Sequence, residues 1–155
     1  MYLNSHLFSS IIEHTPLISI DLIIKNLKGE ILLGKRVNAP AKGAWFVPGG
    51  RIYKDEKLQD AFLRITQEEL GVQFSLSSSD FLGVYEHMYE ENVFNNDFST
   101  HYVVLGFELE LEKELKLNTL QHDNYQWLTI DALFEHQDVH DNVKDYFKKN
   151  KGINQ

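Results

Sequence analysis

Glycines, arginines and carboxylates are concentrated between residues 49 and 72. Gly49 and Gly50 can bring the backbone close to a ligand, where a carbonyl can serve as a hard oxygen ligand. Positions 65 and 69 lie one helical turn apart, so their side chains share one face. A carboxylate on such a face suits Mg²⁺, which proteins bind through one or two carboxylates together with water and substrate phosphates. The segment therefore predicts a loop–helix site for a divalent cation and a phosphate ester.

The elements around this segment can be read from apolar periodicity and turn residues. Residues 17–24 are β-rich and mostly apolar, which predicts a buried strand. A hairpin turn at residues 26–29 leads into a second strand over residues 30–36. A helix is predicted from Glu56 to Leu70, with Asp55 as its N-cap and Gly71 as the left-handed residue that ends it.

The rest of the chain adds strands at residues 81–89, 102–111 and 125–128 and a closing helix at residues 139–149. Strands outnumber helices, and neither a repeat nor a linker interrupts the pattern. The prediction is one α+β domain over residues 1–155.

Composition excludes several functional classes. A chain of 155 residues with 43% hydrophobic residues can bury a core, and it holds no run of apolar residues long enough to cross a membrane. The net charge of −8 argues against binding duplex nucleic acid. The absence of cysteine and of a recognisable secretory signal favours a cytoplasmic enzyme.

The stretch from Gly50 to Val72 resembles the Nudix box, a 23-residue loop–helix–loop signature. The residues at matching positions are Gly50, Glu56, Arg64, Glu68, Glu69, Gly71 and Val72. The chain departs from the pattern at Ile65, where the box has the glutamate that follows arginine, and at Thr66, where it has an apolar residue. In the family that glutamate coordinates metal for pyrophosphate cleavage, so its replacement puts ordinary pyrophosphohydrolase chemistry in doubt.

Box and departure together resemble the GDP-mannose mannosyl hydrolase branch of the superfamily. Further similar stretches are residues 15–17, 33–36, 45–51, 100–107, 121–123 and 127–129. The resemblance implies an α/β/α sandwich with a mixed sheet between helices, and a homodimer. It also implies hydrolysis of GDP-mannose, with GDP-glucose as a further candidate substrate, by attack of water on sugar C1, which yields GDP and a free sugar of inverted configuration.

Roles carried over by position complete what the resemblance implies. The metal ligands for Mg²⁺, or for Mn²⁺, are the Gly49 carbonyl, Glu69 and Gln121, and His122 is the general base. The residues around the GDP-sugar are Arg36 and Arg51 on the diphosphate, with Asp21, His87 and Tyr102 assisting.

Elementary chemistry is consistent with a single base. Inverting hydrolysis of a glycosidic bond normally needs a base for water and an acid for the leaving oxygen. A diphosphate leaves as a stable anion, so a cation and two arginines can replace the acid by neutralising developing charge. A histidine then suffices as the base near neutral pH.

Simpler interpretations and two rival functions stay open. Glu68 and Glu69 could form a solvated helix face, Glu56 and Arg64 could only bridge to shape the loop, and His122 could be a surface residue. One rival function is a conventional pyrophosphohydrolase giving GMP and sugar 1-phosphate, with Glu56 or Glu68 replacing the missing carboxylate. The other is a non-catalytic sensor that binds a nucleotide sugar.

Overall fold

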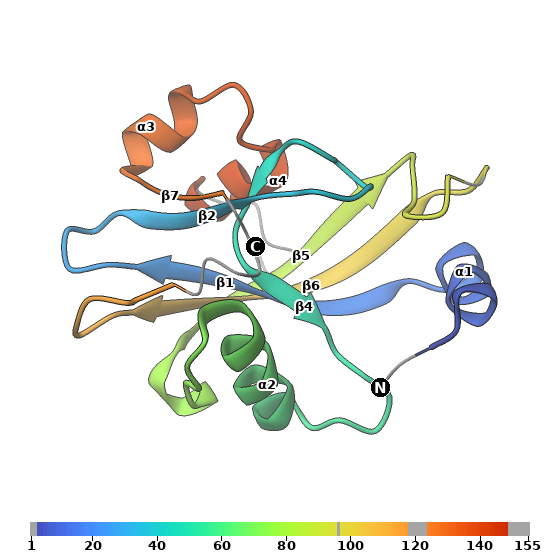
Figure 1. The fold of residues 1–155 in the computed structure, drawn as a ribbon, viewed down its shortest axis with the longest axis horizontal. Helices are drawn as coiled ribbons and strands as arrows, with labels where there is room; N and C mark the ends of the chain where they lie inside the picture. Colours follow the sequence, from blue (N-terminus) through green and yellow to red (C-terminus); the bar gives the residue numbers. More distant parts are fainter. Residues whose placement is uncertain (1–2, 96, 118–123, 149–155) are drawn as a thin grey trace.

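The computed structural model describes residues 3–95, 97–117 and 124–148. A seven-stranded sheet runs in the order β3-β2-β1-β6-β5, with β4 paired to β1 and β7 paired to β2 (Figure 1). The sheet is mixed, because β1 and β6 are parallel whereas the other pairs are antiparallel. The strands are β1 Leu17–Lys25, β2 Ile31–Lys35, β3 Trp45–Phe46, β4 Gly49–Arg51, β5 Asp80–Tyr89, β6 Thr100–Glu110 and β7 Tyr125–Leu128.

Helices cover both faces of the sheet (Figure 1). They are α1 Ser5–His14, α2 Leu58–Leu70, α3 Ile130–Glu135 and α4 Asp141–Lys144, with 3-10 turns η1 Leu76–Ser78 and η2 Asp145–Phe147. The predicted α+β class, with a mixed sheet between helices, is confirmed.

Strand β1 contributes to two apolar cores because its side chains alternate between the faces of the sheet. Ile20 and Leu22 join Phe62 of α2 in one buried cluster. Ile23 points the other way and packs with Leu133 of α3 in a second cluster. The intervening polar residues Ser19 and Asp21 therefore belong to the face opposite α2.

Strands β1 and β2 separate soon after the hairpin that joins them. They are paired at Lys25 and Ile31, after which β2 pairs with β3 and β7. On β1, the residues from Ser19 to Asp21 pair instead with β4. The divergence opens the sheet beside the glycine-rich strand, and the site described below lies there.

Helix α2 begins later than predicted, and the assignment of Asp55 as its N-cap is wrong. The cap is Lys57, which is extended, whereas Asp55 has a positive φ of 66° within the loop. The carboxylate of Glu56 accepts from the backbone N–H of Tyr53 at 2.9 Å, which holds this loop out of the helix. Gly71 ends the helix at φ 75°, as predicted, because a left-handed residue is needed there.

The sequence did not predict two short helices, α1 and α3, and the predicted C-terminal helix is shorter than expected. Helix α1 is capped by Asn4, whose side-chain oxygen accepts from the N–H of Leu7 at 2.9 Å. Helix α3 is capped in the same way by Thr129. The predicted helix over residues 139–149 is wrong in extent, since the described part of it consists of α4 followed by η2.

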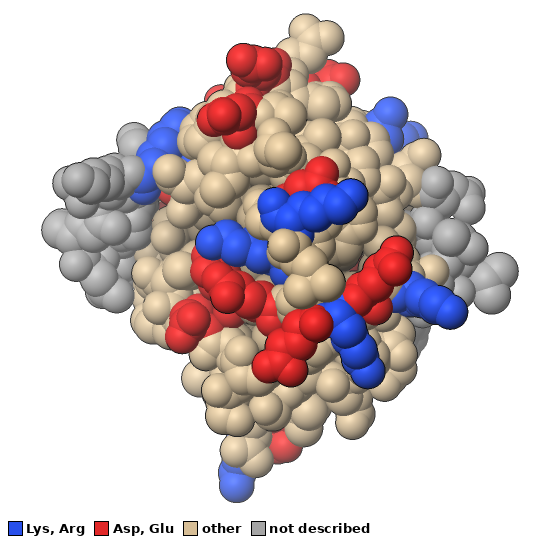
Figure 2. Space-filling model, turned by 90° about the vertical axis from the view of Figure 1, so that its left-hand side faces the viewer, with Lys and Arg blue, Asp and Glu red and all other residues tan. Residues whose placement is uncertain are grey.

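Surface charge is mixed on the face seen in Figure 2, where lysine and arginine side chains stand among aspartates and glutamates. None of the helices in the described part of the chain has the length and apolar character needed to span a lipid bilayer.

Candidate active site

A cavity of about 270 Å³ lies where β1 and β2 diverge. Each predicted site residue that the structure describes lines it: Asp21, Arg36, Gly49, Arg51, Glu69, His87 and Tyr102. The other two predicted residues, Gln121 and His122, lie outside the described residues. Residues far apart in the chain are thus gathered in one pocket, while their individual roles stay predictions.

Strand register explains why these residues meet. Asp21 on β1 is paired with Gly49 on β4, and Ser19 with Arg51. Further along the same sheet, His87 on β5 is paired with Tyr102 on β6. Directly paired residues of neighbouring strands point to the same face, so these polar side chains converge on one side of the sheet.

Gly49 is a place of close backbone approach. A Cβ at this position would lie 2.5 Å from the Ile20 carbonyl oxygen and 2.7 Å from Oδ1 of Asp21. No side chain can be accommodated at that distance, so glycine is required for β4 to lie against Asp21. The backbone of Gly49 consequently forms part of the pocket wall.

Glu69, near the end of α2, is the helix carboxylate that lines the pocket. Burial, and next to it the charge of Glu68, raise its pKa to about 7 against the opposing charge of Arg36. A half-buried carboxylate and a backbone carbonyl that line the same pocket are hard oxygen donors, which fit Mg²⁺. Among the described residues no three His, Cys, Asp or Glu side chains form a metal-binding group. Among the described residues, the predicted ligands for a cation here are the Glu69 carboxylate and the Gly49 carbonyl.

Asp21 and His87 belong to a hydrogen-bonded network in the pocket wall, in which each contacts Tyr146. Burial raises the pKa of Asp21 to about 6, against a hydrogen bond from Tyr146 and the charge of Arg36. Burial also lowers the pKa of His87 to about 4, with a further lowering from His140. His87 is therefore neutral at pH 7, whereas Asp21 is largely ionised.

Both arginines of the pocket contact aromatic rings, and Arg36 also contacts the backbone. Arg36 donates from Nε to the Pro40 carbonyl at 2.8 Å, and its guanidinium lies 5.4 Å from the ring centroid of Phe46. The Arg51 guanidinium lies 4.7 Å from the ring of Phe8 and 5.2 Å from that of Tyr53. Helix α1 thereby reaches the active site through Phe8.

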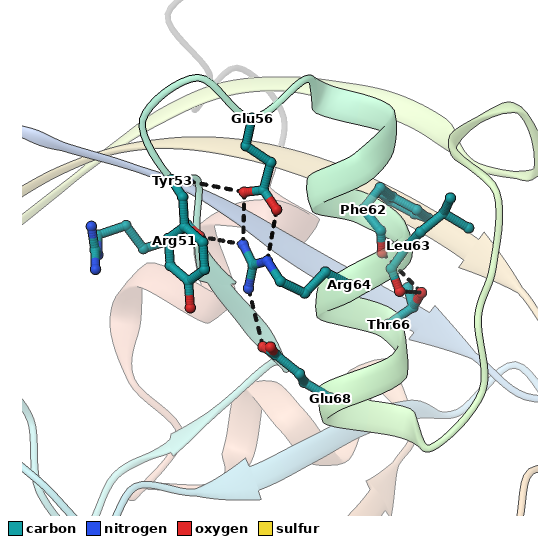
Figure 3. Close-up of polar contacts among 8 residues, drawn as sticks. All are labelled: Arg51, Tyr53, Glu56, Phe62, Leu63, Arg64, Thr66 and Glu68. Carbon is teal, nitrogen blue, oxygen red and sulfur yellow. Dashed lines mark hydrogen bonds and ion pairs between the residues drawn. The ribbon is translucent and has the colours of Figure 1, made fainter. Parts of the chain in front are cut away.

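Glu56 and Arg64 form the bridge that shapes the box loop (Figure 3). Arg64 donates from Nε to Oε1 of Glu56 at 2.7 Å and from Nη2 to Oε2 at 2.9 Å. It also donates to the Arg51 carbonyl at 2.9 Å and to Glu68 at 3.1 Å, with Tyr53 stacked on its guanidinium. The two glutamates are thus paired to arginine, and neither of them lines the cavity.

The two departures from the Nudix box are both buried. Ile65 is 1% exposed and packs in the core cluster shared by α2 and β1. Thr66 donates to the Phe62 carbonyl at 2.8 Å and accepts from the N–H of Phe74 at 3.0 Å, so its hydroxyl is satisfied. Position 65 therefore supplies packing where the box supplies a carboxylate.

Sequence reasoning found Tyr102 but missed three other tyrosines of the site. Tyr89 and Tyr125 line the cavity, and burial raises the pKa of each to about 12. Tyr146 stands behind it, hydrogen-bonded to Asp21. A usable signal existed for Tyr89 alone, because it is two residues from His87 on β5 and such residues share a face. Nothing local in the sequence connects Tyr125 or Tyr146 to the pocket.

Curated relatives and a solved structure are consistent with this geometry. The chain is 42% identical over 116 residues to the low-salt glycan biosynthesis protein Agl8 of Haloferax volcanii. The aligned region covers 74% of this chain and 72% of that protein. It is 29% identical over 141 residues to an ADP-ribose pyrophosphatase of Methanocaldococcus jannaschii, covering 88% and 76% respectively.

The MutT NUDIX hydrolase structure from Burkholderia pseudomallei superposes with a TM-score of 0.68 at 24% identity, covering 88% of this chain and 99% of that one. That likeness shows the fold. The family model of the NUDIX domain matches residues 15–149, and the chain therefore belongs to the Nudix superfamily of hydrolases.

Proposed function

We propose that this Nudix hydrolase cleaves a nucleoside-diphosphate sugar, GDP-mannose first, by attack of water on sugar C1. One observation carries the proposal. The helix presents a single carboxylate, Glu69, to a pocket that also holds two arginines, whereas position 65 is filled by a core isoleucine. Glu56 and Glu68, the other candidates for a replacement carboxylate, are paired to Arg64.

Roles within the pocket follow from charge. Arg36 and Arg51 both line the pocket, and the planar guanidinium group suits a diphosphate. The Gly49 carbonyl, Glu69 and Gln121 would hold Mg²⁺, or Mn²⁺, which neutralises charge on a leaving diphosphate when bound. His122 is the proposed base for water.

Another part of the pocket wall suits a sugar. Asp21 and Tyr102 line it with His87, and together they offer a hydrogen-bond acceptor, a hydroxyl and a neutral imidazole. Sugar hydroxyl groups need such a mixture of donors and acceptors. We propose that this wall binds the glycosyl group.

The Haloferax volcanii relative is named a glycan biosynthesis protein, which supports a nucleotide-sugar substrate. The Methanocaldococcus jannaschii relative is named an ADP-ribose pyrophosphatase, which supports the rival reaction at phosphorus. A homodimer and a cytoplasmic location stay predictions.

Early product analysis separates the candidates. Purified protein is mixed with GDP-mannose and Mg²⁺, and the first products are followed by ¹H and ³¹P NMR. Because GDP-mannose is an α-glycoside, inversion at C1 predicts GDP and β-mannose before mutarotation. GMP and mannose 1-phosphate would instead establish the pyrophosphohydrolase, and binding without turnover would establish the sensor. Glu69→Gln is the inactive control.

A further inference from the structure

Tyr146, from the 3-10 turn η2, lies directly behind the pocket wall that holds Asp21 and His87. Its side chain is 8% exposed, and its O–H donates to Oδ2 of Asp21 at 2.5 Å. The same oxygen lies 3.4 Å from Nε2 of His87. Tyr146 does not line the cavity itself, so it contacts two pocket residues from outside.

The sheet provides a dedicated space for this ring. Gly106 on β6 is the residue paired with Asp21 on β1. A Cβ at Gly106 would lie 3.3 Å from Cε1 of Tyr146 and 3.1 Å from Cε2 of Tyr85, tighter than ordinary contact. The rings of Tyr146 and Tyr85 pack edge to face at 4.6 Å over that glycine. Tyr146 is therefore held against the sheet by its ring, independently of its hydroxyl.

The numbers of hydrogen-bond donors and acceptors on the three groups set the direction of the hydrogen bonds. An ionised carboxylate only accepts, so the single hydroxyl hydrogen of Tyr146 goes to Asp21. Tyr146 can then only accept from His87, which requires the hydrogen on Nε2 of the neutral imidazole. Nδ1 of His87 is left as an acceptor.

We propose that Tyr146 is a positioning residue of the active site, whose hydroxyl holds the Asp21 carboxylate in one orientation and His87 in the Nε2–H tautomer. Each then presents a fixed hydrogen-bonding group to the sugar. This inference rests on the proposed function for its substrate. The arrangement itself rests on the contacts among the three side chains.

The test compares Tyr146→Phe with the matched variant Tyr85→Phe, each in the wild-type chain and in an Asp21→Ala background. Both substitutions remove one hydroxyl from neighbouring rings of the same core cluster. Tyr146→Phe is expected to lower kcat for GDP-mannose by about 10- to 100-fold, with KM changed less than about 3-fold. Tyr85→Phe is expected to leave both constants within about 2-fold, and in Asp21→Ala the Tyr146→Phe effect should vanish, because coupled residues are not additive.

A second readout does not depend on turnover. The hydroxyl proton in the Tyr146–Asp21 hydrogen bond should give a strongly deshielded ¹H NMR signal in the wild type and in Tyr85→Phe. It should be lost in Tyr146→Phe and in Asp21→Ala. A wild-type chain that gives this signal but hydrolyses no nucleotide sugar would refute the proposed function and leave the hydrogen-bond arrangement supported. Equal losses of kcat from Tyr146→Phe with and without Asp21, or a missing proton signal in the wild type, would overturn the inference.

Discussion

Cγ1 of Ile65 lies 3.0 Å from the point that a Cβ of Gly50 would occupy. The isoleucine thus packs on the backbone of β4, one residue from the proposed carbonyl ligand Gly49 and one helical turn from Glu69. Position 65 is next to the reacting region but is filled with hydrocarbon. This contact ties the departure from the Nudix box to the chemistry of the site.

Ile65→Glu should both destabilise the protein and alter its products. Placing a carboxylate at a position 1% exposed in the core costs about 3 kcal/mol or more. In the protein that remains folded, a second carboxylate beside Glu69 should divert part of the reaction to GMP and mannose 1-phosphate. Thermal unfolding and ³¹P NMR measure the two effects.

Ile65→Val is the control for the change at position 65. It should cost about 1 kcal/mol and leave the products unchanged. An Ile65→Glu variant with wild-type stability and wild-type products would contradict the role assigned to position 65.

Glu69→Gln should abolish hydrolysis while leaving the protein folded. Removing the one helix carboxylate of the pocket takes away the charged oxygen ligand for Mg²⁺, but the amide keeps its shape. The neighbouring Glu68→Gln is the matched control, since Glu68 is half exposed and paired to Arg64. Initial rates across a Mg²⁺ titration should separate the two variants by at least about 100-fold. Equal rates would contradict the assignment of Glu69.

Arg64→Lys should weaken the fold of the box loop. Lysine cannot reproduce the two-pronged bond to Glu56, nor the simultaneous bond to the Arg51 carbonyl. We expect a loss of about 2 kcal/mol in the free energy of unfolding. Lys54→Ala, which breaks an exposed pair with Asp55 in the same loop, should leave the melting temperature unchanged. Similar effects of the two variants in chemical denaturation would show that the bridge does not hold the loop.

Asp21→Asn should stabilise the protein in a pH-dependent way. The folded pKa of Asp21 is about 6, above the ordinary 3.8, so ionisation in the folded state is unfavourable. Stability from this group is fully present below about pH 4 and is lost as pH rises through about 6. At pH 8 the variant should therefore have a free energy of unfolding higher than that of the wild type by on the order of 3 kcal/mol, and a higher melting temperature. Near pH 3.5 it should show no gain.

The exposed Asp80→Asn serves as the control for that experiment, because it changes the same formal charge outside the pocket. It should show no comparable pH dependence when melting curves are recorded from pH 3.5 to 8. A constant difference between Asp21→Asn and the wild type over that range would contradict the assigned cause. The stabilised variant should also lose activity, because Asp21 is a proposed substrate-binding residue. Active-site groups of this kind often lower stability.

Much of the fold was predictable because its signals are local. The buried strand β1 and the left-handed Gly71 follow from residues within a few positions of one another. The start of α2 did not follow, since a bridge between Glu56 and Arg64 across the helix start overrides the expected cap at Asp55. Helix α1 escaped detection because its signals are a single cap, Asn4, and a short apolar face.

The site was predictable only through resemblance, and then only in part. Spacing within the box singled out Glu69, which lines the pocket together with Gly49, while the role of each stays a prediction. Tyr146 was out of reach, because its bond to Asp21 joins residues 125 positions apart. Such a contact depends on how η2 packs on the sheet, which no local pattern encodes.

Hydrolysis of GDP-mannose in ¹⁸O-labelled water, with Mg²⁺ and mass analysis of the products, tests the central claim most directly. Attack of water on sugar C1 predicts label in free mannose and none in GDP. Label in GMP or in mannose 1-phosphate would mean attack on phosphorus, and would contradict the role assigned to Ile65 and to the single carboxylate of the helix.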